Sequence, residues 1–218
     1  MIIAIDGPAG SGKSTLGRML ARALNLLYID TGSMYRAVAL ATLESALDPA
    51  NTEAVTDLAQ RVDIKLEGDP DSLRVWLDGI DVTERIREDD ITAMSSIVSS
   101  IPGVRRAMVA RQREMGKRGA VMNGRDIGTV VFPDADVKFF LDAAPEERAA
   151  RRFIEDKQVN PCATLEQTLA EINERDRRDS TRADSPLKIA ADAIVVDSTG
   201  LSIEAVLNCM LEHVHRNN

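Results

Sequence analysis

The sequence predicts an α/β protein with a five-stranded parallel sheet covered by helices on both faces. Apolar, strand-like segments alternate with amphipathic helical segments, which is the pattern of βαβ units. Polar or glycine-containing turns follow several of the strand segments. The expected strands are residues 1–5, 26–29, 120–122, 137–142 and 193–197. A length of 218 residues suits a single domain with small insertions.

Composition narrows the possible functions. Hydrophobic residues at 44% and charged residues at 28% are ordinary for a globular protein. A formal charge of −8 argues against general binding of nucleic acid or membrane surfaces. The two cysteines have no metal-ligand spacing, and we find no signal peptide or membrane-spanning run. We therefore expect a cytoplasmic monomer with reduced thiols.

The first strand leads into a phosphate-binding pattern. The segment reads Gly7, Pro8, Ala9, Gly10, Ser11, Gly12, Lys13, Ser14 and Thr15. Glycines let the backbone wrap an anion, Lys13 can reach the β- and γ-phosphates, and the Ser14 hydroxyl can bind Mg²⁺. A helix over residues 14–24 would add its N-terminal partial charge. A glycine-rich turn that binds nothing is the alternative, but strand, loop and helix together predict a P-loop NTPase core.

The second strand ends at Asp30, and Thr31-Gly32-Ser33 is expected to form a turn that caps a helix over residues 34–47. Because parallel strands place their following loops at one edge of the sheet, Thr31 and Arg36 should face the same cleft as the glycine loop. A simple cap and a solvated arginine are the alternative for these two residues.

The pattern of apolar and polar residues changes in the middle of the chain. A helix is expected over residues 52–61, followed by strands at 63–67, 73–77 and 80–83. Turn signals between these strands predict a small antiparallel sheet, which we expect to shape the ligand pocket. Helices over 88–100 and 104–117 are separated by Pro102-Gly103, and Arg105 lies in the first turn of the second one.

The third strand of the main sheet runs into a polar turn from Asn123 to Thr129 that contains Gly124, Arg125 and Asp126. This turn should bring polar side chains to the ligand edge. After the fourth strand, a helix begins near residue 145 and carries Arg148, Arg151 and Arg152 on one face.

A second helix over residues 164–180 carries Arg175 and Asp179, with Arg182 next on the same stripe. Interleaved acidic residues allow these arginines to form a solvated, ion-paired surface. With a P-loop in the chain, however, a mobile lid that neutralises a transferring phosphoryl group and excludes water is the better hypothesis. The last strand is followed by a closing helix over residues 202–215.

Four separated motifs together resemble those of the bacterial cytidylate kinases. They are residues 5–14, the Asp30-Thr31-Gly32-Ser33-Met34-Tyr35-Arg36 segment, the Gly124-Arg125-Asp126-Ile127-Gly128-Thr129 turn, and Glu174-Arg175-Asp176 with Asp179 and Arg182. The resemblance implies transfer of a phosphoryl group from ATP to CMP or dCMP with Mg²⁺. It also implies a core (1–30, 118–147 and 185–218), a nucleoside-monophosphate-binding region (31–117) and a lid (148–184).

The resemblance further implies roles for individual residues. Residues 7–15 with Arg151 and Arg152 would bind ATP, and Ser14 would bind the metal. The CMP-binding residues would be Thr31, Arg36, Ser96, Arg105, Arg125, Asp126, Arg175, Asp179 and Arg182. Lys13, Arg125, Arg175 and Arg182 would act in catalysis. Serine is common in the family where this chain has Thr31, and an acidic residue is common where it has Asn123, which leaves a metal-positioning role for Asn123 open.

Two other functions fit parts of the sequence. One is a P-loop kinase with a different small acceptor, such as UMP, AMP or shikimate. The other is a nucleotide-controlled switch, but the sequence has no Asn-Lys-x-Asp guanine-reading motif.

Overall fold

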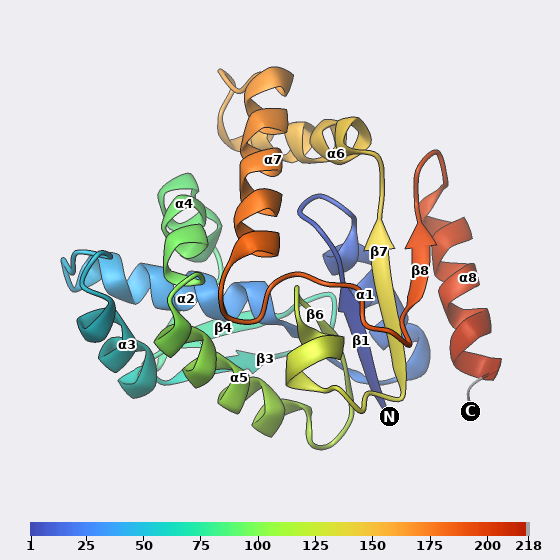
Figure 1. Ribbon diagram of the computed structural model, residues 1–218, viewed down its shortest axis with the longest axis horizontal. Coiled ribbons are helices and arrows are strands. Elements are labelled where there is room, and N and C mark those ends of the chain that lie inside the picture. The colour runs from blue at the N-terminus through green and yellow to red at the C-terminus, as the bar shows by residue number, and fades with distance from the viewer. Residues whose placement is uncertain (217–218) are drawn as a thin grey trace.

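The main sheet of the computed structural model has five parallel strands. The structure describes residues 1–216, apart from the side chains of residues 155, 158 and 159; residues 217 and 218 of the expected core segment lie outside it. The strands are β1 (Ile2–Asp6), β2 (Leu27–Asp30), β6 (Ala120–Asn123), β7 (Val137–Asp142) and β8 (Ile194–Asp197), in the order β2-β6-β1-β7-β8. All neighbours pair in parallel, which confirms the predicted architecture (Figure 1).

Helices cover both faces of this sheet. On one face, α1 (Lys13–Leu24) and α8 (Ile203–Arg216) bury Leu16, Leu20 and Met210 against Ile3 and Phe139. On the other face, α5 (Pro102–Gly116) and a π-helical turn at Ile127–Val131 pack on the sheet. The predicted alternation of strands and amphipathic helices therefore produces a three-layer core.

The small antiparallel sheet lies beside this core. Its strands are β3 (Ile64–Glu67), β4 (Arg74–Leu77) and β5 (Ile80–Asp81), and α3 (Thr52–Arg61) precedes them. Its apolar side chains, including Val75 and Leu77, pack in one cluster with residues of α2 (Thr31–Glu44). A cavity of about 1170 Å³ lies beside the phosphate-binding loop, and none of the described residues of the small sheet lines it. The expectation that this sheet shapes the pocket is therefore wrong, because the sheet packs against α2 instead.

Two helix starts differ from the sequence prediction by more than one residue. Helix α2 begins at Thr31 rather than residue 34, because the Asp30 carboxylate accepts a hydrogen bond from the Gly32 N–H at 3.1 Å and caps the helix. Pro102 ends the segment after α4 (Asp89–Val98) but also starts α5, where its missing N–H costs nothing.

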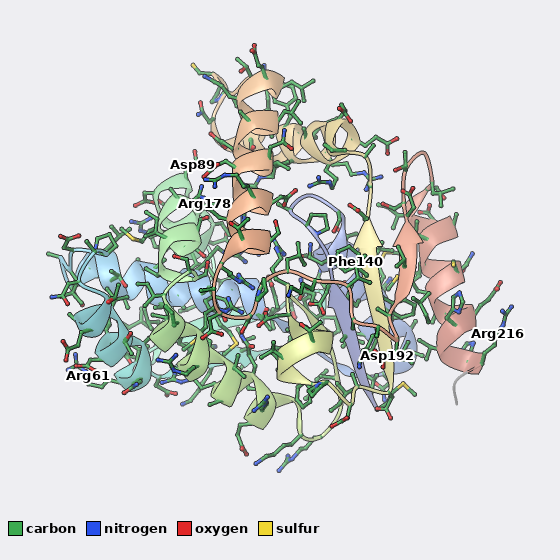
Figure 2. The ribbon with its side chains drawn as sticks, viewed as in Figure 1. Arg61, Asp89, Phe140, Arg178, Asp192 and Arg216 are labelled. Atoms are coloured by element: carbon green, nitrogen blue, oxygen red, sulfur yellow. The ribbon has the colours of Figure 1, made fainter. Side chains whose placement is uncertain are left out.

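A helical hairpin stands at the carboxyl edge of the main sheet. Strand β7 leads directly into α6 (Pro145–Val159), and α7 (Leu165–Thr181) returns toward the core (Figure 1). The Thr164 hydroxyl accepts from the Gln167 N–H at 3.3 Å and caps α7. Across from α7 stands α4, and Asp89 and Arg178 line the cavity from these two helices (Figure 2). No helix within residues 1–216 is long and apolar enough to span a bilayer.

Candidate active site

The phosphate-binding loop connects β1 to α1 in a tight wrap. Gly7, Gly10 and Gly12 have φ values of 150°, 72° and 89°, which favour glycine. A Cβ atom on Gly7 would lie only 2.0 Å from the Leu141 carbonyl oxygen. A side chain at Gly7 or Gly10 would clash with neighbouring backbone, and at Gly12 the positive φ alone favours glycine. The N-terminus of α1 points its free amides into the loop.

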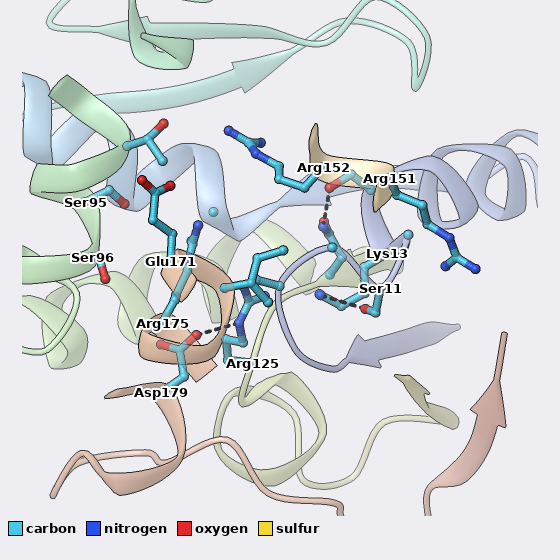
Figure 3. A pocket seen from close by; sticks show the side chains of 18 of the residues that line it. Ser11, Lys13, Ser95, Ser96, Arg125, Arg151, Arg152, Glu171, Arg175 and Asp179 are labelled. Carbon is cyan, nitrogen blue, oxygen red and sulfur yellow. Dashed lines mark hydrogen bonds and ion pairs between the residues drawn. The ribbon is translucent and has the colours of Figure 1, made fainter. Parts of the chain in front are cut away.

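Lys13 occupies the centre of the loop. Its Nζ atom donates to the Pro8 carbonyl at 2.5 Å and to the Ser11 hydroxyl at 3.1 Å (Figure 3). Burial, together with the nearby Arg125 and Arg175 guanidiniums, holds the pKa of the Lys13 ammonium well below its usual range. A bound phosphate would supply the negative charge that this buried ammonium group lacks.

Ser14, Asn123 and Asp30 form a polar group beside the loop. The Asn123 Nδ2 atom donates to the Ser14 hydroxyl at 3.2 Å and to the Asp30 carboxylate at 3.5 Å. The Asn123 Oδ1 atom is buried without a hydrogen-bond donor among the described residues. These oxygen atoms are of the type that Mg²⁺ prefers, and one or two protein ligands are usual when a nucleotide supplies the others. The residues present therefore fit the ion.

Across the cavity, Arg36 and Thr31 lie at the start of α2. The Arg36 Nη2 atom is 3.2 Å from the Asp30 carboxylate, and the Thr31 hydroxyl donates to the Asn123 carbonyl at 2.8 Å. Burial raises the pKa of Asp30, but the Arg36 charge and the surrounding hydrogen bonds outweigh burial and leave this pKa lowered. The prediction that Thr31 and Arg36 face the cleft is confirmed, since both line the cavity.

A buried chain of charges links α5, the turn after β6 and the end of α7. The Arg105 Nη2 atom donates to Asp126 at 2.5 Å, and the Arg105 guanidinium lies 5.3 Å from the centre of the Tyr35 ring. Arg182 is 3.8 Å from the other Asp126 oxygen and 3.2 Å from Asp179. Arg105 and Asp126 are almost fully buried. Arg105 is therefore not part of a solvated helix face.

Arg125 and Asp179 continue this chain toward the phosphate-binding loop. The Arg125 Nε atom donates to Asp179 at 2.8 Å, and Arg175 lies beside them on α7 (Figure 3). Arg125 and Arg175, together with Arg182, outweigh the effect of burial and lower the pKa of Asp179. Arg175 makes no hydrogen bond or ion pair with the residues that the structure describes. Burial and the Arg125 charge lower its pKa to about 10. Its guanidinium is thus available for an anion.

Several buried donors make no hydrogen bond within the described part of the chain. Among them are Arg36 Nε, Arg105 Nε and Arg182 Nη2, which belong to residues that line the cavity. Buried donors without partners are costly, and a ligand with phosphate and base oxygens would satisfy them. The cavity is thus built to accept a polar anion opposite the phosphate-binding loop.

Arg151 and Arg152, the two arginines predicted to bind ATP, lie on α6 and point in opposite directions (Figure 3). Arg151 donates to the Ser198 hydroxyl and carbonyl, both at 3.0 Å, so it braces the loop before α8. Arg152 contacts Asp156 at 2.7 Å. Both line the cavity, which is where the prediction places them.

One cavity of about 1170 Å³ contains nearly all of the predicted site. Its lining includes Ala9, Gly10, Ser11, Gly12, Lys13, Ser14, Thr15, Thr31, Arg36, Ser96, Arg105, Arg125, Asp126, Arg151, Arg152, Arg175, Asp179 and Arg182. Gly7 and Pro8 belong to the loop but do not line it. Leu201 and Ile203 line the end of the cavity near α8 but could not be found from the sequence, because single apolar residues around a helix start carry no site pattern. The sequence places Arg148 on a helix face and Asp176 in a motif but assigns neither of them a role of its own.

These features define a class of protein. A P-loop with a buried lysine faces an arginine-lined acceptor region across one cavity, under a helical hairpin, as in phosphotransferases that act on small acceptors. Two solved structures share the fold. An uncharacterized protein from Eubacterium ventriosum has a TM-score of 0.56 at 13% identity, covering 99% of this chain and 98% of that one. Shikimate kinase from Acinetobacter baumannii has a TM-score of 0.50 at 15% identity, covering 99% and 93%.

Sequence comparison identifies the family. The cytidylate kinase family model matches residues 3–216. A cytidylate kinase of Solibacter usitatus is 51% identical over 217 residues, covering 98% of this chain and 92% of that protein. The cytidylate kinase of Desulforamulus reducens is also 51% identical, covering 98% and 96%. The chain belongs to the cytidylate kinase family, which confirms the resemblance seen in its motifs.

Proposed function

We propose that the cavity transfers the γ-phosphoryl group of ATP to CMP and dCMP, yielding ADP with CDP or dCDP. This is the reaction for which the family is named, and the chain is a nucleoside monophosphate kinase of this family. The observation that carries the proposal is the placement of Lys13 and Ser14 on one side of a single cavity and of Arg36, Arg125 and Arg175 on the other.

On the donor side, the amides of residues 7–15 bind the ATP phosphates, and Lys13 exchanges the Pro8 carbonyl for phosphate oxygens. Arg151 and Arg152 lie at the donor end of the cavity. Ser14 binds Mg²⁺, with Asp30 and Asn123 beside it. When bound, Mg²⁺ neutralises charge that develops on the phosphate oxygens.

On the acceptor side, Thr31, Arg36 and Arg125 bind the CMP phosphate. Ser96, Arg105 and Asp126 recognise the cytosine, whose amino group donates a hydrogen bond to the Asp126 carboxylate. Asp179 contacts the sugar hydroxyls. Arg175 and Arg182 reach the phosphate and base region from α7, and unpartnered donors on Arg36, Arg105 and Arg182 support this assignment.

The transfer needs no general base. The acceptor phosphate has a second pKa of about 6, so it is already mostly dianionic and nucleophilic at neutral pH. An acceptor oxygen attacks the γ-phosphorus in line while the bond to the ADP oxygen breaks. Lys13, Arg125, Arg175 and Arg182 hold the two anions together and stabilise the charge of the transition state.

We assign three parts to the chain on this basis. The core comprises 1–30, 118–147 and 185–218, the acceptor-binding region 31–117, and the lid 148–184. We also propose that the enzyme works as a cytoplasmic monomer. Light scattering of the purified protein, with one mass near that of a single chain, would support the monomer; a stable dimer would contradict it.

An acceptor screen tests the proposal. ADP release with ATP and Mg²⁺ is measured for CMP, dCMP, UMP, AMP and shikimate at equal concentrations. We expect CMP and dCMP to give the highest kcat/KM. A higher value for any other acceptor would favour a different small-acceptor kinase, and GTP hydrolysis that needs no acceptor would favour a switch.

A further inference from the structure

The Ala9 peptide in the phosphate-binding loop is held from both sides by the hairpin. The Asp176 carboxylate on α7 accepts from the Ala9 N–H at 3.0 Å. The Arg148 Nη1 atom on α6 donates to the Ala9 carbonyl at 2.8 Å and to the second Asp176 oxygen at 2.5 Å. We call Ala9, Arg148 and Asp176 the Ala9 clamp. It joins the loop, α6 and α7 in one closed ring of interactions.

Close packing surrounds the Ala9 clamp. The side chain of Arg148 is 6% exposed and that of Asp176 is 20% exposed. A Cβ atom on Gly10 would lie 2.8 Å from the Arg148 carbonyl oxygen, so α6 touches the loop backbone directly. Ala9 also packs with Ala149 and Ile172, one residue from each hairpin helix. The loop and the hairpin therefore meet without a gap.

Neither clamp side chain lines the cavity, whereas Arg175 and Asp179 on the same helix do. The other polar contacts of α7 with the core use Asp179 and Arg182, which pair with Arg125 and Asp126. Those side chains are proposed to contact the acceptor. Asp176 contacts the loop outside the cavity lining, so a bound acceptor need not displace this contact.

Helix α6 has its own attachment to the core. The Gly200 N–H donates to Glu147 at 3.0 Å, and Arg151 holds Ser198. The first turns of α6 are thus fixed at the loop before α8. With α6 fixed there, the Asp176 contact helps to hold the middle of α7 beside the phosphate-binding loop.

We propose that Arg148 and Asp176 are positioning residues for phosphoryl transfer, which clamp the Ala9 peptide and thereby set the place of Arg175 and Asp179 over the donor. This inference rests on the proposed transfer reaction. A buried arginine is needed because it neutralises a carboxylate that would otherwise repel a triphosphate bound to the same loop.

Kinetics provide the first test. Asp176→Ala removes the ion pair and the bond to the Ala9 N–H, whereas Asp176→Asn keeps an acceptor for that N–H. We expect kcat to fall by about 10- to 100-fold for Asp176→Ala, the range that small misplacements cause, and by less for Asp176→Asn. The KM for ATP should stay within about threefold, because Lys13 and the loop amides remain. ATP hydrolysis without acceptor should rise relative to transfer, because a displaced hairpin admits water.

A matched control is Arg177→Gln. Arg177 is the next residue on α7, is 65% exposed and pairs only with Glu174 among the described residues. The Arg177→Gln substitution should leave the rate of phosphoryl transfer and the rate of ATP hydrolysis without acceptor unchanged. If Asp176→Ala merely reduced the amount of folded enzyme, the ratio of hydrolysis to transfer would equal that of the unmutated enzyme, and the proposal would be wrong.

A distance measurement tests the clamp without relying on activity. The chain has two cysteines, and both are free and exposed: Cys162 between the hairpin helices and Cys209 on α8. Spin labels on this native pair report the distance from hairpin to core by pulsed electron resonance. We expect a narrow distribution for the unmutated chain and Arg177→Gln, and a broader or shifted one for Asp176→Ala and Arg148→Met. Equal distributions in all four proteins would overturn the proposal. Failure of the unmutated chain to phosphorylate CMP would overturn the function instead.

Discussion

At the scale of single residues, Asp126 connects acceptor recognition to the buried charges around it. Its two oxygens face Arg105 and Arg182, so the carboxylate is held in a fixed position between two guanidinium groups. A carboxylate fixed in this way can accept a hydrogen bond from the cytosine amino group. Uracil presents a carbonyl at the same position and would be repelled.

We therefore expect Asp126→Ala to lose the preference for CMP over UMP. The ratio of kcat/KM values for the two acceptors should fall by about tenfold or more, because a buried hydrogen bond that one substrate lacks discriminates strongly. Asp184→Ala is the control, since Asp184 carries a similar charge but does not line the cavity. Comparable kcat/KM for CMP and UMP in the unmutated enzyme would contradict the role of Asp126.

Asp6 gives a second prediction at this scale. Burial raises the pKa of its carboxyl to about 6 from 3.8, although the Gly128 and Ile127 amides, each donating at 2.8 Å, oppose the rise. The folded protein thus binds this proton more tightly than the unfolded chain. The stabilisation from the proton is complete below pH 4 and is lost as the pH rises to about 6.

Urea unfolding across this pH range should reveal the loss. A shift from 3.8 to about 6 corresponds to roughly 3 kcal/mol. The free energy of unfolding of the unmutated protein, minus that of Asp6→Asn, should decrease by about this amount between pH 4 and pH 6.5. A difference that stays constant with pH would show that the Asp6 pKa is not raised.

At the scale of elements, the connection into β8 depends on an ion pair with β7. Lys138 lies on the central part of the sheet with 7% of its side chain exposed, and its Nζ atom donates to both Asp192 oxygens at 2.9 and 2.7 Å. The Pro133 carbonyl is its other acceptor. Asp192 therefore tethers the chain that returns from α7 to the edge strand.

Asp192→Asn should destabilise the fold, because it leaves the buried Lys138 ammonium without its counter-charge. We expect a lower free energy of unfolding, measured with urea, even though the Asp192 side chain itself is 65% exposed. Asp71→Asn provides the comparison: its pair with Arg22 is exposed on both sides and should contribute less than about 1 kcal/mol. Equal effects of the two substitutions would refute the assigned role of Asp192.

At the scale of the whole molecule, both substrates are expected in one cavity beneath the hairpin. A single ligand that carries adenosine and cytidine joined by a phosphate chain should then contact the loop, α2 and α7 together. A ligand that binds only the folded state raises the free energy of unfolding by RT ln(1 + [L]/Kd), where [L] is the concentration of free ligand.

Such a bisubstrate ligand should raise Tm more than ATP and CMP added together at the same concentration, because it binds without a second loss of translational freedom. Differential scanning fluorimetry measures the shift. Lys13→Met should reduce the shift from ATP and from the bisubstrate ligand, but not the shift from CMP alone. If the bisubstrate ligand raised Tm no more than ATP does, the ATP and CMP sites would not lie in one continuous cavity.

Much of the fold could be predicted from local patterns. The helix at Thr52–Arg61 and the strand at Val137–Asp142 have the predicted bounds, because their periodicity and flanking turns lie within the segments themselves. The start of α2 was misplaced by three residues, because the Asp30 side chain acts as the cap that Thr31 was expected to provide. The role of the small sheet could not be predicted either, because it depends on which face of α2 the sheet covers.

Local sequence patterns are enough to predict the P-loop, the succession of strands and helices, and the motifs that identify the family, since these depend on residues close together in the chain. Only the tertiary structure showed that Arg105 is buried against Asp126 and that Asp176 clamps Ala9 from 167 residues away. The reason is physical. A charged side chain looks the same in sequence whether it faces water or a partner, and only folding decides which of the two it meets.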